Sequence, residues 1–198
     1  MKEEIAKGSI GEVKHVQADF GIWASGRVTT KDLGGGACLD IGIYCIQLAQ
    51  FVFDGEKPAK VLAGGHLNQD GVDVFGSGTF LYSQGKSASF QYSSQLKTAC
   101  QAHIYGSKGK MSLKFPFWCS NQLELPDGKI LEFPLPKGRH DFNFWNSAGL
   151  AFEAQHVREC LQKGLKESPA VPHSETLTIA ELMEDVRKQI GVVYKQDE

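Results

Sequence analysis

The residues best suited to chemistry lie in one short stretch. Asp40 and Tyr44 are four positions apart and follow the glycine run 34–36. In a helix, side chains at positions i and i+4 lie one above the other on the same face. A carboxylate and a phenol held together in this way suit proton transfer to or from a substrate hydroxyl. A tyrosine has a pKa of about 10, so Tyr44 needs a nearby cation to ionise at neutral pH. The ordinary alternative is a packed tyrosine whose hydroxyl is bonded locally.

A buried helix is expected to carry this pair, from Asp40 to Phe53, after a loop over residues 24–36. Apolar side chains recur on one side of it, and few charges interrupt them. The expected buried stripe consists of Ile41, Cys45, Leu48 and Val52.

Strands dominate much of the remaining sequence. Alternating apolar and polar residues predict a long strand over Glu12–Ile22. From residue 60 to 133 short strands are separated by Gly, Asn, Asp and Pro, which hairpin turns require, so most pairs should be antiparallel. The expected strands are Val61–Leu67, Val72–Tyr82, Ser87–Leu96, Ala99–Tyr105, Lys110–Phe115, Gln122–Leu125 and Ile130–Phe133.

Helices are expected at both ends of the chain. A short one is predicted over Lys2–Lys7, and a later one over Leu150–Leu161, followed by Gly164 as its cap. The last helix reaches Ile190 and is entered through Ser174 as N-cap. The fold class is therefore α+β: one large, mainly antiparallel, open-faced sheet with helices packed on one face.

Composition narrows the classes of partner. The chain has 198 residues, 41% of them hydrophobic and 22% charged, with a net charge of −2, so it can bury a core and resembles an ordinary globular domain. Lys and Arg are scattered, which argues against nucleic acid. Ile41–Phe53 is too short for a bilayer span, so no membrane partner is expected. The first residues lack a signal core, which predicts a cytoplasmic protein.

Metal and disulfide chemistry are not expected. The five cysteines contain no CxxC and are predicted to be reduced thiols. The six histidines show no HxxxH or HExxH spacing, so no metal site is predicted. The chain also lacks a GxGxxG turn between a strand and a helix, so it should hold no dinucleotide cofactor by itself.

The stretch GGGACLDIGIYC, residues 34–45, resembles the G-G-G-x-L-x-D-x-G-x-[HY] element of the glucose-fructose oxidoreductase/inositol dehydrogenase (Gfo/Idh/MocA) family. It has the variant ending in tyrosine, which is found in a branch that oxidises trans-dihydrodiols. The resemblance covers nearly the whole chain but only the second half of such enzymes. It implies that residues 1–198 are a C-terminal substrate-binding and dimerisation domain, without the N-terminal Rossmann domain. Further matching segments are Gly8–Gly21, Tyr44–Gln47, Val52–Pro58, Gly71–Asp73, Gly106–Gly109, Trp118–Cys119, Glu153–Pro169 and Gln189–Val192.

The resemblance also implies roles for individual residues. Tyr44 would be the general acid/base, with Asp40 orienting the substrate or a catalytic lysine that lies in the absent domain. Aromatic walls of a substrate pocket would be Trp118, Phe20 and Phe144. Core packing is the alternative for each of these rings.

The resemblance also gives roles to two glycines and to two basic residues. Gly35 and Gly36 would let the backbone approach the nicotinamide closely, and a flexible loop is the alternative. Lys14 and His66 stand where the family branch has substrate-binding arginines. Lysine keeps the charge without the bidentate fork, and histidine is partly neutral near pH 7, so substrate preference should differ.

The intact enzyme implied by this resemblance uses NADP. It would oxidise trans-dihydrodiols to catechols, and pyranose sugars such as D-xylose to lactones. A homodimer through the open sheet face is expected, because a second copy would cover that face. The alternative is a non-catalytic dimerisation or scaffold module that keeps only the sheet.

Overall fold

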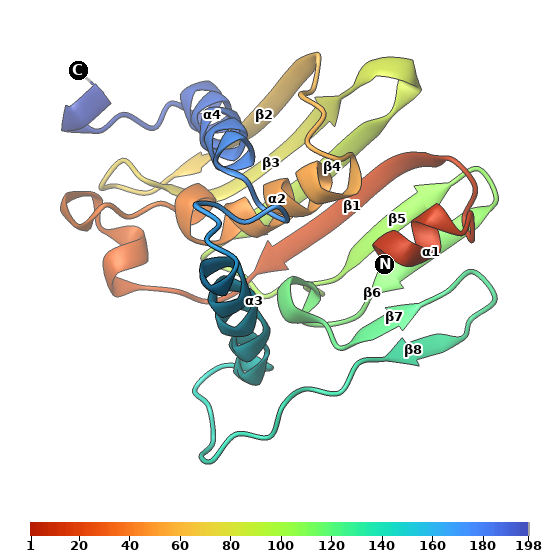
Figure 1. Cartoon of the computed structure of the whole chain (residues 1–198). Helices are drawn as coiled ribbons and strands as arrows, with labels where there is room; N and C mark the ends of the chain where they lie inside the picture. Colours follow the sequence, from red (N-terminus) through yellow and green to blue (C-terminus); the bar gives the residue numbers. More distant parts are fainter. Residues whose placement is uncertain (198) are drawn as a thin grey trace.

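A single mixed sheet of eight strands forms the centre of the computed structural model, which describes residues 1–197 (Figure 1). Its strand order is β2-β3-β4-β1-β5-β6-β7-β8. Only β1 and β4 pair in parallel, and the other neighbours are antiparallel. The strands are β1 (Val13–Gly21), β2 (Lys60–Leu67), β3 (Asp73–Leu81), β4 (Ser87–Ser93), β5 (Ala102–Gly106), β6 (Gly109–Leu113), β7 (Gln122–Glu124) and β8 (Ile130–Glu132). The predicted α+β class and mainly antiparallel open sheet are confirmed.

Alternation along each strand gives the sheet two different faces. In β1, Val16, Ala18 and Phe20 are buried on the core face. The residues between them point the other way, so His15 reaches the serine hydroxyls of β4. Successive side chains of a strand leave opposite faces, which is why the sequence pattern places an apolar core on one side only.

Two helices cover the core face (Figure 1). α2 (Ile43–Val52) contacts β1 and β4, and α4 (His173–Ile190) contacts β2 and β3. The short α1 (Lys2–Ala6) packs Ile5 against the same core. The predicted stripe of α2 and the preceding turn is buried: Ile41, Cys45, Leu48 and Val52.

α3 (Leu150–Gln162) differs from the prediction of helices packed on the sheet. None of its residues is buried, and Leu150, Val157 and Leu161 are exposed. In Figure 1 α3 lies beside the arrow end of β1. Its apolar stripe exists as the spacing predicts, but no element among the described residues covers it.

Local geometry corrects three other predictions. Asp40 lies in a wide π-type turn, Cys38–Gly42, rather than in the α-helix itself. The expected loop over residues 24–36 contains two 3-10 turns, Gly26–Thr29 and Lys31–Leu33. Ser174 is inside α4 and is not its cap, because Pro172 takes that position and the Glu167 carboxylate accepts the His173 N–H at 2.7 Å.

The helical run Lys31–Val52 is long and apolar enough, by length and composition, to span a bilayer. The segment Ile41–Phe53, taken alone, is too short. However, 67% of its apolar window is buried inside the fold. Its hydrophobicity is therefore accounted for by packing on the sheet. All five cysteines are free.

Candidate active site

An aromatic cavity of about 700 Å³ lies where β1 ends and α2 begins. Phe20, the penultimate residue of β1, stacks on Trp118 with ring centroids 3.7 Å apart and planes 6° apart. Tyr44, in the first turn of α2, packs its ring edge-on against Phe20 at 5.4 Å. These three rings come from three separate elements and form one continuous wall.

The opposite side of the cavity comes from the segment before α3. Phe144 and Trp145 line it, and both are largely exposed, Phe144 at 76%. The segment is tied to the Trp118 turn because the Asn146 side chain donates to the Cys119 carbonyl at 3.1 Å. Trp145 also packs edge-on against Phe115 at 5.2 Å. The cavity therefore has an inner wall of packed rings and a rim formed by the exposed Phe144 and Trp145.

Asp40 and Tyr44 bring polar chemistry to this cavity, and both line it. The Asp40 carboxylate accepts a hydrogen bond from Arg27, which lies in the Gly26–Thr29 turn. Burial, and secondarily the nearby Asp40 carboxylate, raise the pKa of Tyr44 above its ordinary value. The Tyr44 side chain is 43% exposed, so its ring is held while solvent and ligands can still reach it.

The structure brings together five of the residues singled out from sequence: Tyr44, Asp40, Trp118, Phe20 and Phe144. Lys14 and His66 lie elsewhere. Lys14 forms an ion pair with Glu12 at 2.7 Å, at the far end of β1 from Phe20. His66 is on the edge strand β2, opposite Phe75. Neither lines the cavity, and their proposed substrate contacts remain predictions.

Gly35 and Gly36 are buried, and the cavity wall does not include them. A Cβ at Gly35 would lie 2.5 Å from the Arg27 carbonyl oxygen. The surrounding atoms lie so close to both glycines that a side chain would clash with them. The predicted backbone contact of these glycines to a nicotinamide stays a prediction.

Sequence reasoning missed several residues of the site. Arg27 was not predicted, because its pairing with Asp40 spans a loop that carries no periodic signal. Cys119 and Trp145 also line the cavity. Cys119 lies in the family-matching pair Trp118–Cys119, although only Trp118 was predicted to line the pocket, and burial raises the pKa of Cys119.

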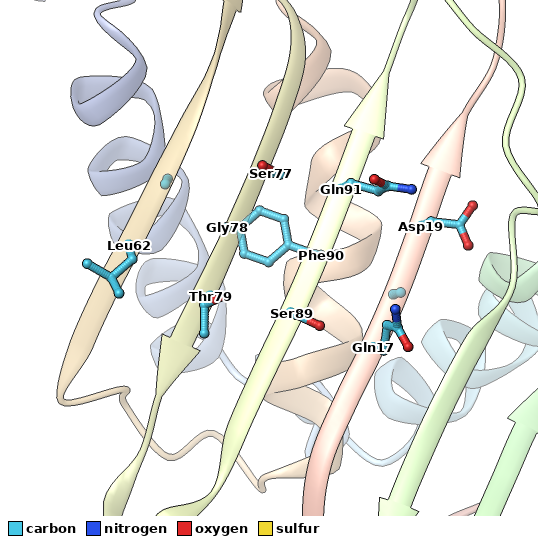
Figure 2. A pocket seen from close by; sticks show the side chains of 11 residues that line it. Gln17, Asp19, Leu62, Ser77, Gly78, Thr79, Ser89, Phe90 and Gln91 are labelled. Carbon is cyan, nitrogen blue, oxygen red and sulfur yellow. The ribbon is translucent and has the colours of Figure 1, made fainter.

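A second hollow, of about 540 Å³, lies on the open face of the sheet (Figure 2). Side chains of β1, β3 and β4 stand on it, and the helices lie behind the sheet (Figure 2). Its polar lining consists of Gln17, Asp19, Ser77, Thr79, Ser89 and Gln91. Lacking an apolar wall and a pair of acid–base groups, it fits a ligand site less well than the aromatic cavity does.

No cofactor or metal site is evident in residues 1–197. No group of three His, Cys, Asp or Glu side chains in this range could hold a metal ion. The sequence contains no dinucleotide fingerprint. That this chain alone holds no dinucleotide stays a prediction.

Comparison with known proteins places the chain in a family. The sequence model of the GFO/IDH/MocA C-terminal domain matches residues 1–112. The chain belongs to this family.

Individual relatives agree with that assignment. The chain is 40% identical over 199 residues to human trans-1,2-dihydrobenzene-1,2-diol dehydrogenase, covering all of this chain and 59% of that protein. It is 40% identical to the Danio rerio protein of the same name, covering 98% of this chain and 58% of the relative. The chain thus spans less than two thirds of the length of these relatives.

Solved structures share the fold. Aldose-aldose oxidoreductase from Caulobacter crescentus, complexed with glycerol, matches with a TM-score of 0.71 at 20% identity, over 94% of this chain and 56% of that one. KijD10, a 3-ketoreductase from Actinomadura kijaniata, in complex with NADP and TDP-benzene, gives 0.72 at 23% identity, over 97% of this chain and 58% of that one.

Proposed function

We propose that this chain is the substrate-binding domain of a nicotinamide-dependent oxidoreductase that acts on CH–OH groups of cyclic diols. The observation that carries the proposal is the position of Tyr44 and Asp40 in the wall of a cavity that is also lined by the rings of Phe20, Trp118, Phe144 and Trp145, among other residues. Aromatic walls fit a flat or cyclic substrate, while a phenol and a carboxylate can handle the proton of its hydroxyl.

In the proposed reaction Tyr44, as phenolate, takes the hydroxyl proton while the carbon loses a hydride and becomes a carbonyl. The hydride acceptor, for which we propose NADP, would be held by the part of the intact protein outside this chain. Burial and Asp40 raise the pKa of Tyr44, which opposes ionisation. Arg27 pairs with Asp40, and in this proposal its positive charge offsets part of the rise in the Tyr44 pKa. A lysine of the other domain would lower the Tyr44 pKa further.

The proposed substrates are trans-dihydrodiols of aromatic hydrocarbons, with pyranose sugars such as D-xylose as a second class. The names of the curated relatives support the first class. The aldose-aldose oxidoreductase with the same fold makes the second a reasonable candidate. Some structures with this fold contain NADP and others NAD⁺ or NADH, and we propose NADP from the resemblance.

We propose that a nucleotide-binding domain covers α3 and the cavity rim. α3 has no buried residue, and its apolar side chains continue from the exposed Phe144 and Trp145. An exposed apolar surface of this kind is typical of an interface. The relatives are longer than this chain, which leaves room for such a domain.

We also propose a homodimer through the open face. Its central strands carry uncharged polar side chains, with Asp19 as the charged exception in the hollow of Figure 2, and interface centres are depleted in charge. Sedimentation of the purified chain at micromolar concentration is expected to show a dimer, and a monomer would contradict this part of the proposal.

Titration of the purified chain with catechol, the product proposed for a trans-dihydrodiol substrate, tests the function. Quenching of Trp118 and Trp145 fluorescence should saturate, and NADPH should cause no saturable change. Tyr44→Phe, which keeps the ring, should weaken catechol binding, while Tyr105→Phe on the open face should not. A dimer that fails to bind catechol would instead favour the non-catalytic dimerisation module.

Adding the nucleotide-binding half of a relative in trans completes the test. Turnover of a trans-dihydrodiol should then appear with the wild-type chain and be absent with Tyr44→Phe. Equal turnover with both chains would contradict the assigned role of Tyr44.

A further inference from the structure

Asp73, at the start of β3, is a carboxylate with no exposed surface. One of its oxygens, Oδ2, accepts the backbone N–H of Cys38 at 2.6 Å. The geometry gives the other, Oδ1, no hydrogen bond, although the neighbouring Tyr92 hydroxyl acts on Asp73 to lower its pKa in part. Burial raises the pKa of Asp73 above its ordinary value. A buried carboxylate is costly unless it is well paired, so this side chain calls for an explanation beyond packing.

The partner of Asp73 begins the segment that carries the proposed acid–base pair. Cys38 is the first residue of the wide turn Cys38–Gly42, which contains Asp40 and leads directly into α2 and Tyr44. The first N–H groups of a helix lack partners within it, and a carboxylate there also complements the helix dipole. The residue at the cap position, Ala37, has no side chain for this task, so Asp73 fills it from 35 positions away.

The glycine run makes room for this contact. A Cβ at Gly36 would lie 2.8 Å from Asp73 Oδ1 and 2.9 Å from the Tyr194 hydroxyl. Gly36 also has φ of 135°, which side-chain-bearing residues rarely adopt. Tyr194 in turn donates to the Gly35 carbonyl, and its ring lies under the Arg187 guanidinium at 4.8 Å. The close approach of Asp73 and Tyr194 therefore explains Gly36, whereas Gly35 is explained by the loop carbonyl oxygens, including that of Arg27, that lie against it.

We propose that Asp73 is a positioning residue for the acid–base pair: by fixing the Cys38 N–H it holds the turn that sets the surroundings of the Tyr44 phenol. This inference rests on the proposed function for its significance. The contact itself, however, makes a prediction that needs no substrate. Loosening the turn should expose Tyr44 and move it away from Asp40, which are the two main causes that raise its pKa.

The test is a titration of the Tyr44 phenol by NMR in the full chain with ¹³Cζ-labelled tyrosine, assigned by its loss in Tyr44→Phe. In Asp73→Ala the Tyr44 pKa should fall toward the ordinary value, by about half a pKa unit or more. In Asp73→Asn it should stay as in the wild type, because an amide oxygen can still accept the Cys38 N–H. Rescue by asparagine separates positioning from a general loss of packing.

An unchanged Tyr44 pKa in a folded Asp73→Ala chain would overturn the inference, and so would an equal fall in Asp73→Asn. If Asp73→Ala does not fold, Asp73→Ser replaces it, since a serine is too short to reach the Cys38 N–H. Failure of the proposed function gives a different result: catechol would not bind to the wild-type chain, while the Tyr44 pKa would still depend on Asp73.

Discussion

The two faces of the sheet are built from the same strands and differ in almost every property. On the core face, Phe20 and Phe90 pack under α2, and the aromatic cavity opens at the end of β1. On the open face, His15 and Gln17 of the same β1 stand among serines of β4. Alternation of apolar and polar residues along the strands therefore separates the face that carries the aromatic cavity from the polar open face.

Adjacent residues of β3 should differ most in their effect on stability. Phe80 has no exposed surface, and Phe80→Ala should lower the free energy of unfolding by about 3–5 kcal/mol. Thr79 stands on the open face, and Thr79→Ala should change it by about 0.5 kcal/mol or less. Urea denaturation measures both. Similar losses for the two variants would contradict the assignment of the faces.

Removal of a wall of the aromatic cavity should weaken ligand binding without unfolding the chain. Trp118→Ala is expected to lower catechol affinity about tenfold, the effect of one lost aromatic contact of about 1.4 kcal/mol. Trp23→Ala is the matched control, because Trp23 is exposed and does not line the cavity. Calorimetric titration measures both affinities, and an equal loss in the control would argue against the cavity.

Asp73 gives the core face an unusual pH dependence. Its pKa is raised in the folded state, so the folded state holds this proton more tightly than the unfolded state does. This group therefore adds stability as pH falls, opposite to a salt-bridged carboxylate. The free energy of unfolding of Asp73→Asn minus that of the wild type should decrease from about pH 7 to about pH 4. An increase in this difference between pH 7 and pH 4 would mean that folding lowers the Asp73 pKa, which would contradict the prediction.

His15 should give the open face the reverse dependence, with a smaller effect. Both its ring nitrogens contact serine hydroxyls, at 2.8 and 2.9 Å, and burial lowers its pKa. The folded state then holds this proton less tightly, so stability is present above the ordinary histidine pKa of about 6.5 and is lost as pH falls through the lowered value.

The corresponding variant is His15→Gln. Between about pH 7 and pH 5 it should lose less stability than the wild type, by about 1 kcal/mol or less because the ring is partly solvated. His140→Gln, on an exposed segment, controls for the loss of an imidazole. Equal pH profiles for His15→Gln and the wild type would show that the His15 pKa does not contribute to the pH dependence of stability.

The contrast also explains what could be predicted from sequence. Period-two alternation predicted β1, because residues such as Val16 and Phe20 are apolar for the same reason that they are buried, and turn residues between short segments predicted the other seven strands. The motif resemblance identified Tyr44, Asp40 and Trp118, which the structure then brings together.

What escaped prediction depends on contacts distant in sequence. The pairing of Arg27 with Asp40, the cap from Asp73 to Cys38 and the parallel β1–β4 pair leave no periodic trace. α3 has the spacing of a packed helix, and that spacing cannot tell which element would cover it.

The central claim is that a small cyclic diol binds on the core-face side, against Phe20, Tyr44 and Trp118. Mapping of catechol onto the ¹⁵N-labelled chain by NMR tests it most directly. We expect saturable shifts concentrated at these three residues and at Trp145, with none in the hollow of Figure 2. Shifts concentrated at Gln17, Ser77 and Gln91 on the open face would contradict it.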